Sequence, residues 1–212
     1  MRKFVFLIAL SIFGFAQAHA QKFGFKGGYN YSSLNGEVAQ NSTLKGLNGF
    51  YVGALMELPI GDVLALQPEI IYSRQGAAWE YDVPLLGKGV IKNDLRLDYL
   101  NIPVMAKVNL GPLFLQGGVQ FGFLVGKPEV SYTVGNLSNS QKLDKDAYAA
   151  FDCGVGAGLG INFNSHFFAE ARYTHSLTNS FDNSNTSLRN ARISDTNNFK
   201  NAVLSLGVGV KF

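Results

Sequence analysis

The stretch DCGVGAGLGINF, residues 152–163, places glycine at every second position from Gly154 to Gly160. A loop that binds dinucleotide phosphates needs glycines at positions i, i+2 and i+5, and counting from Gly154 or Gly156 reaches Leu159 or Ile161 instead. A strict period of two is typical of a β-strand, whose alternate side chains point to opposite faces. The stretch therefore predicts a strand with one glycine face and one apolar face, and no nucleotide cofactor.

The same alternation recurs in seven further segments. In each, apolar residues occupy one parity, while glycine, amide and charged residues occupy the other. Together with 151–163, the predicted strands are 23–32, 50–58, 64–73, 99–109, 113–124, 166–175 and 202–212. Each is about as long as a tilted strand needs to cross a bilayer.

The connections between these strands alternate in length. The short ones are Pro59–Val63, Gly111-Pro112 and Asn164-Ser165, and the long polar ones are 33–49, 74–98, 125–150 and 176–201. Short periplasmic turns and long extracellular loops are typical of outer-membrane barrels. We therefore expect an all-β fold, an eight-stranded antiparallel transmembrane β-barrel with both ends of the chain at the periplasmic rim.

Alternation alone does not decide which face points outward, because a lipocalin-like soluble barrel encloses its apolar face. Aromatic residues on the apolar face favour the membrane barrel, since they form two girdles at the strand ends. The girdles are Phe23, Phe163, Phe167 and Phe212 at one rim, and Tyr31, Phe50, Tyr72, Phe123, Phe151 and Tyr173 at the other. The chain also ends on an aromatic residue after a strand, as outer-membrane barrels commonly do.

The N-terminus carries the features of an export signal. Arg2 and Lys3 precede an apolar run of signal-peptide length, and Ala18-His19-Ala20 matches the small-x-small cleavage pattern. We expect a signal peptide over 1–20 and a barrel domain over 21–212, placed in the outer membrane in contact with its lipid. The net charge of +3 gives no indication of nucleic-acid binding, and Cys153, the only cysteine, has no disulfide partner.

The polar face carries four positive and four negative side chains, so we expect a formally neutral interior. These inward residues are Lys26, Glu57, Glu69, Lys107, Asp152, Glu170, Arg172 and Lys211. Eight strands enclose a lumen just wide enough for side chains, and charges there must pair. We predict a structural, salt-bridged plug, with two candidate contacts: Asp152–Arg172, and Lys26 with the neighbours of Lys211. The strand glycines either leave room for long side chains such as Arg172 or let the sheet curve tightly.

Two chemical alternatives compete with this structural role. Glu57, Glu69 and Glu170 resemble a set of paired acids, but any small polar-lined barrel has such a set. Lipid A-modifying barrels use His, Ser and acidic residues at the extracellular rim, and His175-Ser176 lies there without an acidic partner on its face. We therefore predict no enzyme, and no metal site at His166, which has no clustered partner.

Several strings in the chain resemble the Bacteroidetes outer-membrane β-barrel family, porin-like or PorT-like. The most specific are Gln67-Pro-Glu69, Tyr99-Leu-Asn-Ile-Pro103 and Glu170-Ala-Arg172-Tyr173. The resemblance covers nearly the whole chain after residue 20 and implies an outer-membrane barrel, with one branch serving a secretion apparatus. The leading hypothesis is a non-enzymatic barrel whose extracellular loops bind a surface partner or maintain the envelope. The alternatives are a small channel or a PorT-like secretion accessory and, third, the lipid-modifying enzyme.

Overall fold

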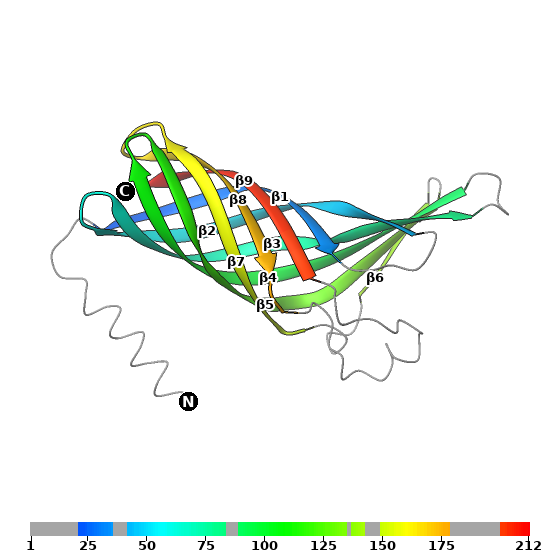
Figure 1. Ribbon diagram of the computed structural model, residues 1–212. Helices are drawn as coiled ribbons and strands as arrows, with labels where there is room; N and C mark the ends of the chain where they lie inside the picture. Colours follow the sequence, from blue (N-terminus) through cyan, green and yellow to red (C-terminus); the bar gives the residue numbers. More distant parts are fainter. Residues whose placement is uncertain (1–20, 36–41, 84–88, 135–136, 143–148, 179–199) are drawn as a thin grey trace, which may run out of the picture.

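The computed structural model describes residues 21–35, 42–83, 89–134, 137–142, 149–178 and 200–212. These residues form nine β-strands (Figure 1). The strands are β1 (Lys22–Asn35), β2 (Ser42–Ile60), β3 (Leu64–Val83), β4 (Gly89–Leu110), β5 (Leu113–Val134), β6 (Leu137–Lys142), β7 (Phe151–Asn162), β8 (Phe167–Ser176) and β9 (Lys200–Lys211). No helix capable of crossing a membrane occurs among the described residues.

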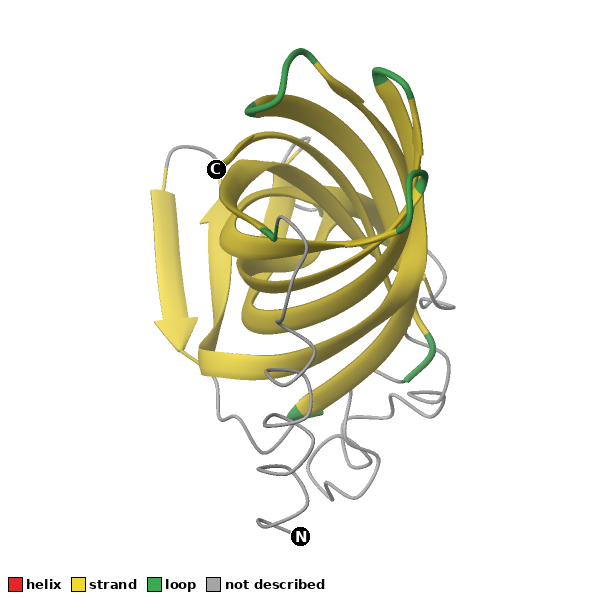
Figure 2. Cartoon of the chain, turned by 90° about the vertical axis from the view of Figure 1, so that its left-hand side faces the viewer, coloured by secondary structure: helices red, strands yellow, loops and turns green. Residues whose placement is uncertain are grey.

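Eight of the strands close into an antiparallel barrel. The neighbours run β4-β3-β2-β1-β9-β8-β7-β5, and a further pairing of β4 with β5 completes the ring. Figure 2 looks at the barrel from the end with the short turns and shows the strands curving around one lumen. The ninth strand, β6, pairs only with β5 among the described strands, from the pair Glu129–Lys142 to the pair Val134–Leu137. It is not one of the eight strands of the barrel wall. The predicted eight-stranded barrel is confirmed.

Four strands are longer than the sequence predicted. The ranges 33–49, 74–98 and 125–150 were expected to be loops, but β2, β3, β4 and β5 run for 19, 20, 22 and 22 residues. They continue past the ends of β1, β7, β8 and β9 as a protruding sheet (Figure 1). The prediction failed because the polarity of the two faces reverses in these extensions: inward side chains such as Leu95 and Leu97 are apolar, and outward ones such as Arg96 are charged. The fourth expected loop, 176–201, lies mostly outside the described residues.

The two faces of the barrel have the orientation that the membrane barrel requires. Large apolar residues of the predicted outward parity are exposed, and nine of the ten girdle aromatics are among them. The tenth, Tyr72, is half-buried, with its ring 6.0 Å from that of Phe50. The lipocalin-like arrangement is excluded, because the apolar parity points away from the lumen.

The short turns and the C-terminus lie at one end of the barrel, opposite the protruding sheet (Figure 1). Gly61 and Gly111 hold φ angles of 73° and 69° in two of these turns, a conformation that favours glycine. In the third turn, the Asn164 side chain accepts hydrogen bonds from the backbone of His166 and Phe167, both at 2.8 Å. The arrangement agrees with periplasmic turns and an extracellular sheet.

The protruding sheet buries its own apolar side chains. Leu95 and Leu97 on β4, Ala77 on β3 and Val130 on β5 are all almost completely buried. Backbone register places Ala77 opposite Leu95, and Leu95 opposite Val130. The sheet is therefore a packed extension of the barrel.

Candidate functional site

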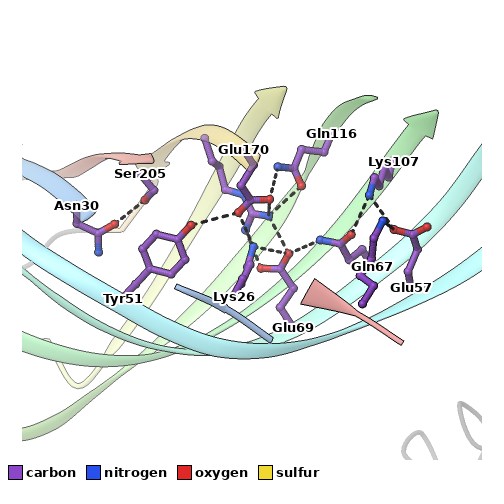
Figure 3. Close-up of polar contacts among 12 residues, drawn as sticks. Lys26, Asn30, Tyr51, Glu57, Gln67, Glu69, Lys107, Gln116, Glu170 and Ser205 are labelled. Carbon is purple, nitrogen blue, oxygen red and sulfur yellow. Dashed lines mark hydrogen bonds and ion pairs between the residues drawn. The ribbon is translucent and has the colours of Figure 1, made fainter. Parts of the chain in front are cut away.

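Seven of the eight predicted inward charges are buried inside the barrel. They are Lys26, Glu57, Glu69, Lys107, Glu170, Arg172 and Lys211, and each is at most 6% exposed. They come from β1, β2, β3, β4, β8 and β9, so the sequence places them far apart and closure of the barrel brings them together (Figure 3).

The largest group, called here the ion quartet, consists of Lys26, Glu69, Glu170 and Arg172. Lys26 Nζ lies 2.8 Å from Glu69 Oε1 and 2.7 Å from Glu170 Oε1, so one ammonium joins both carboxylates. The Arg172 guanidinium donates to both oxygens of Glu69, at 2.8 and 2.7 Å. It also lies 3.6 Å from Glu170 Oε2. Each cation therefore contacts each anion, which compensates four buried charges.

Amide side chains complete the hydrogen bonding of the quartet. Gln67 Nε2 donates to Glu69 at 2.6 Å, and Gln116 Nε2 donates to Glu170 at 3.1 Å. Gln116 also accepts from Arg172 Nη2 at 2.9 Å. Carboxylates taken out of water need such donors as well as counter-charges.

A second group, called here the lysine pair, lies nearer to the turn end and centres on Glu57. Lys107 Nζ and Lys211 Nζ lie 2.7 and 3.1 Å from the same oxygen, Glu57 Oε2. Lys107 Nζ also lies 3.9 Å from the centre of the Phe114 ring, a cation–π contact. Lys211 Nζ lies 5.3 Å from the centre of the Phe168 ring. The faces of these two rings thus help to stabilise two ammonium groups that share the carboxylate of Glu57.

The buried charges do not sum to zero, contrary to the expectation of a neutral interior. The quartet has two cations and two carboxylates, and the second group has two lysines and one carboxylate, so the seven charges sum to +1. The missing negative charge is Asp152, which lies apart from both groups. Asp152 accepts hydrogen bonds from Ser176 at 2.7 Å and Thr178 at 2.6 Å.

Of the two candidate contacts, Asp152–Arg172 was wrong, because Arg172 pairs with Glu69 and Glu170. Lys26 does lie opposite Gly209, two residues from Lys211, although its ammonium binds Glu69 and Glu170. The Asp152–Arg172 contact was inferred from neighbouring strands. The register instead sets Arg172 opposite Gly158, six positions along β7 from Asp152.

Apolar side chains inside the lumen were missed by the sequence analysis. Leu55, Phe114 and Phe168 form a buried cluster, and the two rings lie 6.3 Å apart in an edge-on arrangement. Phe114 has the inward parity of Gln116, and Phe168 has that of Glu170, so the alternation already indicated that both rings point into the lumen. They were overlooked because every inward residue was assumed to be polar.

Three of the lumen glycines make room for aromatic side chains, whereas a Cβ on most of the others would meet backbone atoms of the neighbouring strand. A Cβ on Gly160 would overlap the Phe114 ring, one on Gly209 would overlap the Phe168 ring, and one on Gly207 would overlap the Tyr51 hydroxyl. At Gly158 a Cβ would lie 3.1 Å from Gln116 Nε2 and 3.1 Å from Arg172 Cα. The predicted packing role therefore stands, although Phe114 and Gln116, rather than the Arg172 side chain, occupy the space beside the 154–160 stripe.

Above the quartet, toward the protruding sheet, neutral side chains line the lumen. Ser205 donates to Asn30 at 2.7 Å, Asn30 donates to Ser73 at 2.7 Å, and Gln75 donates to Ser73 at 2.8 Å. Asn201 Nδ2 in turn donates to Gln75 Oε1. We call these five residues the amide ladder. Between the ladder and the quartet lies a cavity of about 20 Å³.

The histidine and serine considered for catalysis at the extracellular rim lie on opposite faces of β8. His175 has the outward parity of Tyr173, whereas Ser176 is buried in the lumen and donates to Asp152. A histidine and a serine on opposite faces of a strand cannot act as base and nucleophile toward one substrate. His166 lies at the turn end, 3.0 Å from Ser165, and the described residues include no metal-binding group of three His, Cys, Asp or Glu.

With the closed barrel, its lipid-facing exterior and its polar interior established, comparison with known proteins assigns the family. Residues 15–182 match the family described as "Outer membrane protein beta-barrel domain". The chain belongs to this family. It is therefore an outer membrane protein, as the girdles and the C-terminal aromatic predicted. The comparison with curated proteins finds no match.

The solved structures to which this chain is similar include outer membrane proteins. Neisserial surface protein A (NspA) is similar at a TM-score of 0.53 and 15% identity, over 92% of this chain and 100% of NspA. The attachment invasion locus protein Ail of Yersinia pestis is 16% identical, with a TM-score of 0.46, 92% of this chain covered and 100% of Ail. A major outer membrane protein from Thermus thermophilus is also 16% identical, with a TM-score of 0.47 over 92% of this chain and 100% of the other. At such identities the likeness concerns the fold alone.

Proposed function

We propose that this outer membrane protein is a non-enzymatic, non-conducting barrel that acts through the sheet it projects on the extracellular side. The observation that carries the proposal is the length of β2–β5. A tilted strand crosses a bilayer with roughly 9–11 residues, and β4 and β5 have 22 residues each. About half of each strand therefore extends beyond the lipid, and Leu95, Leu97 and Val130 give this extension a packed interior. A rigid platform of this kind suits the binding of a partner in the medium or on another cell.

The filled lumen supports a role outside the barrel interior. The ion quartet and the lysine pair occupy successive levels of the lumen, and Leu55, Phe114 and Phe168 fill the level of the lysine pair. The cavity of about 20 Å³ is close to the volume of one water, far below that of a solute. The buried charges serve closure and stability in this proposal, and they have no catalytic task.

Two measurements test the two halves of this proposal. In planar bilayers, the purified barrel is expected to show no stable conductance of porin size, and such a conductance would refute the closed lumen. In a Cys153→Ala background, Lys127→Cys on exposed β5 is expected to react with a membrane-impermeant maleimide on intact cells. The matched control, His166→Cys at the turn end, is expected to react only after permeabilisation. The reverse pattern would place the protruding sheet in the periplasm.

A complementation experiment identifies which part of the protein acts. Register pairs Ala78 with Asp94, so replacing residues 79–93 by Asn-Gly shortens the β3–β4 hairpin and leaves the lipid-facing strands intact. This variant is expected to migrate as a folded barrel and to fail to restore envelope integrity in a deletion strain, measured by dye uptake. A lumen variant, Gln116→Leu, is expected to restore it. The opposite result would move the function into the lumen.

The export signal over residues 1–20 and the assignment to a Bacteroidetes porin-like or PorT-like group remain part of this proposal. Residues 1–20 lie outside the described residues, and the support for cleavage after Ala20 is the sequence pattern alone. N-terminal sequencing of the protein from outer membranes is expected to begin at Gln21. A secretion accessory role predicts loss of secreted cargo on deletion, and unchanged cargo would exclude it.

A further inference from the structure

The cavity in the middle of the lumen has walls from two hydrogen-bonded networks. Lys26, Glu170 and Arg172 of the ion quartet line one side, and Asn30, Ser73, Gln75 and Ser205 of the amide ladder line the other. Its volume is about 20 Å³, and a cavity needs roughly 10–15 Å³ on this measure to hold a water. Size and polarity therefore match one small polar molecule.

One atom on the wall needs such a molecule. The Arg172 side chain is 4% exposed, and its two terminal nitrogens donate to Glu69 and Gln116. Its third donor, Nε, has no hydrogen-bond acceptor among the described residues. Because a buried N–H without an acceptor is strongly unfavourable, an acceptor in the cavity is expected.

We propose that the cavity is a binding site for a single water molecule that accepts a hydrogen bond from Arg172 Nε and donates to the amide ladder. The charges nearby select a neutral ligand. Two cations and two carboxylates balance in the quartet, the Glu170 carboxylate on the wall repels an anion, and the Arg172 guanidinium repels a cation. Water supplies the acceptor that Arg172 Nε lacks among the described residues, and its two hydrogens can be donated to the hydroxyl and amide oxygens that line the opposite wall.

The site has a structural consequence for the whole lumen. Below it, hydrogen bonds run from Arg172 through Glu69, Gln67 and Lys107 to Glu57, and from there to Lys211 and Asn162. Above it, the amide ladder runs to Asn201. The water joins these two parts into one hydrogen-bonded column along the barrel. This inference concerns the interior and holds independently of the proposed extracellular role.

Ser205 provides a matched pair of variants for the test, because it lines the cavity and is the backbone partner of Arg172. Ser205→Ala and Ser205→Val both remove the hydroxyl that donates to Asn30, but only valine adds bulk at the cavity. Crystal structures of the detergent-solubilised barrel, at a resolution that shows ordered water, are expected to hold a peak within hydrogen-bond distance of Arg172 Nε. The peak is expected in the wild type and in Ser205→Ala, and its loss is expected in Ser205→Val.

The wild-type map decides the proposal even if the valine variant fails to fold. No peak beside Arg172 Nε, or a protein atom accepting from it directly, would overturn the water site. Crystals soaked in bromide separate water from an anion. An anomalous peak in the cavity would show that the ligand is an anion and would refute the proposal, whereas a peak without anomalous signal supports it.

Discussion

Among the described residues, Glu57 is the one counter-charge of two buried lysines, so its replacement provides a direct test of the lumen electrostatics. Lys107 and Lys211 both contact Glu57 Oε2, at 2.7 and 3.1 Å, and the three side chains are 1%, 4% and 6% exposed, in the order Lys107, Lys211, Glu57. Glu57→Gln keeps the size of the side chain and removes its charge. Two ammoniums then remain in a buried site without a carboxylate. The matched variant Lys107→Met removes one lysine and leaves a neutral Glu57–Lys211 pair.

The two variants are expected to differ severalfold in their effect on the free energy of unfolding. Removing one partner of a buried ion pair costs about 3–5 kcal/mol, because the other charge stays buried and uncompensated. The cost of Glu57→Gln is expected at or above this range, because it leaves two buried lysines without a counter-charge. Lys107→Met loses a contact at 3.9 Å to the Phe114 ring, worth up to about 2 kcal/mol. A thioether packed on that ring returns about 0.3–1.5 kcal/mol, so the net cost is expected below about 1.7 kcal/mol, which is less than the cost of Glu57→Gln.

The assay is urea unfolding in lipid vesicles. The folded fraction is measured on a gel, because the unboiled, folded barrel migrates faster than the unfolded chain. The double variant Glu57→Gln with Lys107→Met is expected to recover part of the loss, because one stranded charge is gone. A cost below about 1 kcal/mol for Glu57→Gln, or an equal cost for Lys107→Met, would refute the reasoning.

Three further predictions follow from the lumen and the exterior. Gly207→Ala is expected to destabilise the barrel by about 1–3 kcal/mol through overlap with Tyr51, measured by the same unfolding assay. Gly117→Ala, whose Cβ meets nothing closer than 3.8 Å, is expected to be nearly neutral, and equal effects would contradict the packing role of the lumen glycines. Asp152→Asn is expected to lower the free energy of unfolding by less than about 1.5 kcal/mol, because the partners of Asp152 are hydroxyls. Glu170→Gln disrupts the quartet and is expected to lower it by about 3–5 kcal/mol. A reversed order would place Asp152 in the charge network. Cys153→Ala is expected to leave folding and complementation unchanged, and loss of complementation with normal folding would give the thiol a function.

The sequence was sufficient for the features that depend on a single strand. Alternation along each strand identified the outward aromatics and the inward charges, because successive side chains of a strand always point to opposite faces. The same rule located His175 on the outer face. It failed for the ends of β2–β5, because there the inner face is apolar instead of the outer one, as at Leu95 and Leu97. It was applied too narrowly at Phe114 and Phe168, which parity placed in the lumen.

The sequence by itself thus determined the class of barrel, the two faces, the girdles and the identity of the buried charges. Only the tertiary structure decided which charges meet. Arg172 binds Glu69 from 103 residues away, and Lys26 binds Glu170 from 144 residues away. Such contacts are made across the lumen between strands that are not neighbours, so they depend on the height of each residue along the barrel axis. That height is set by the stagger and tilt of all eight strands when the barrel closes, so it cannot be inferred from the sequence of any single strand.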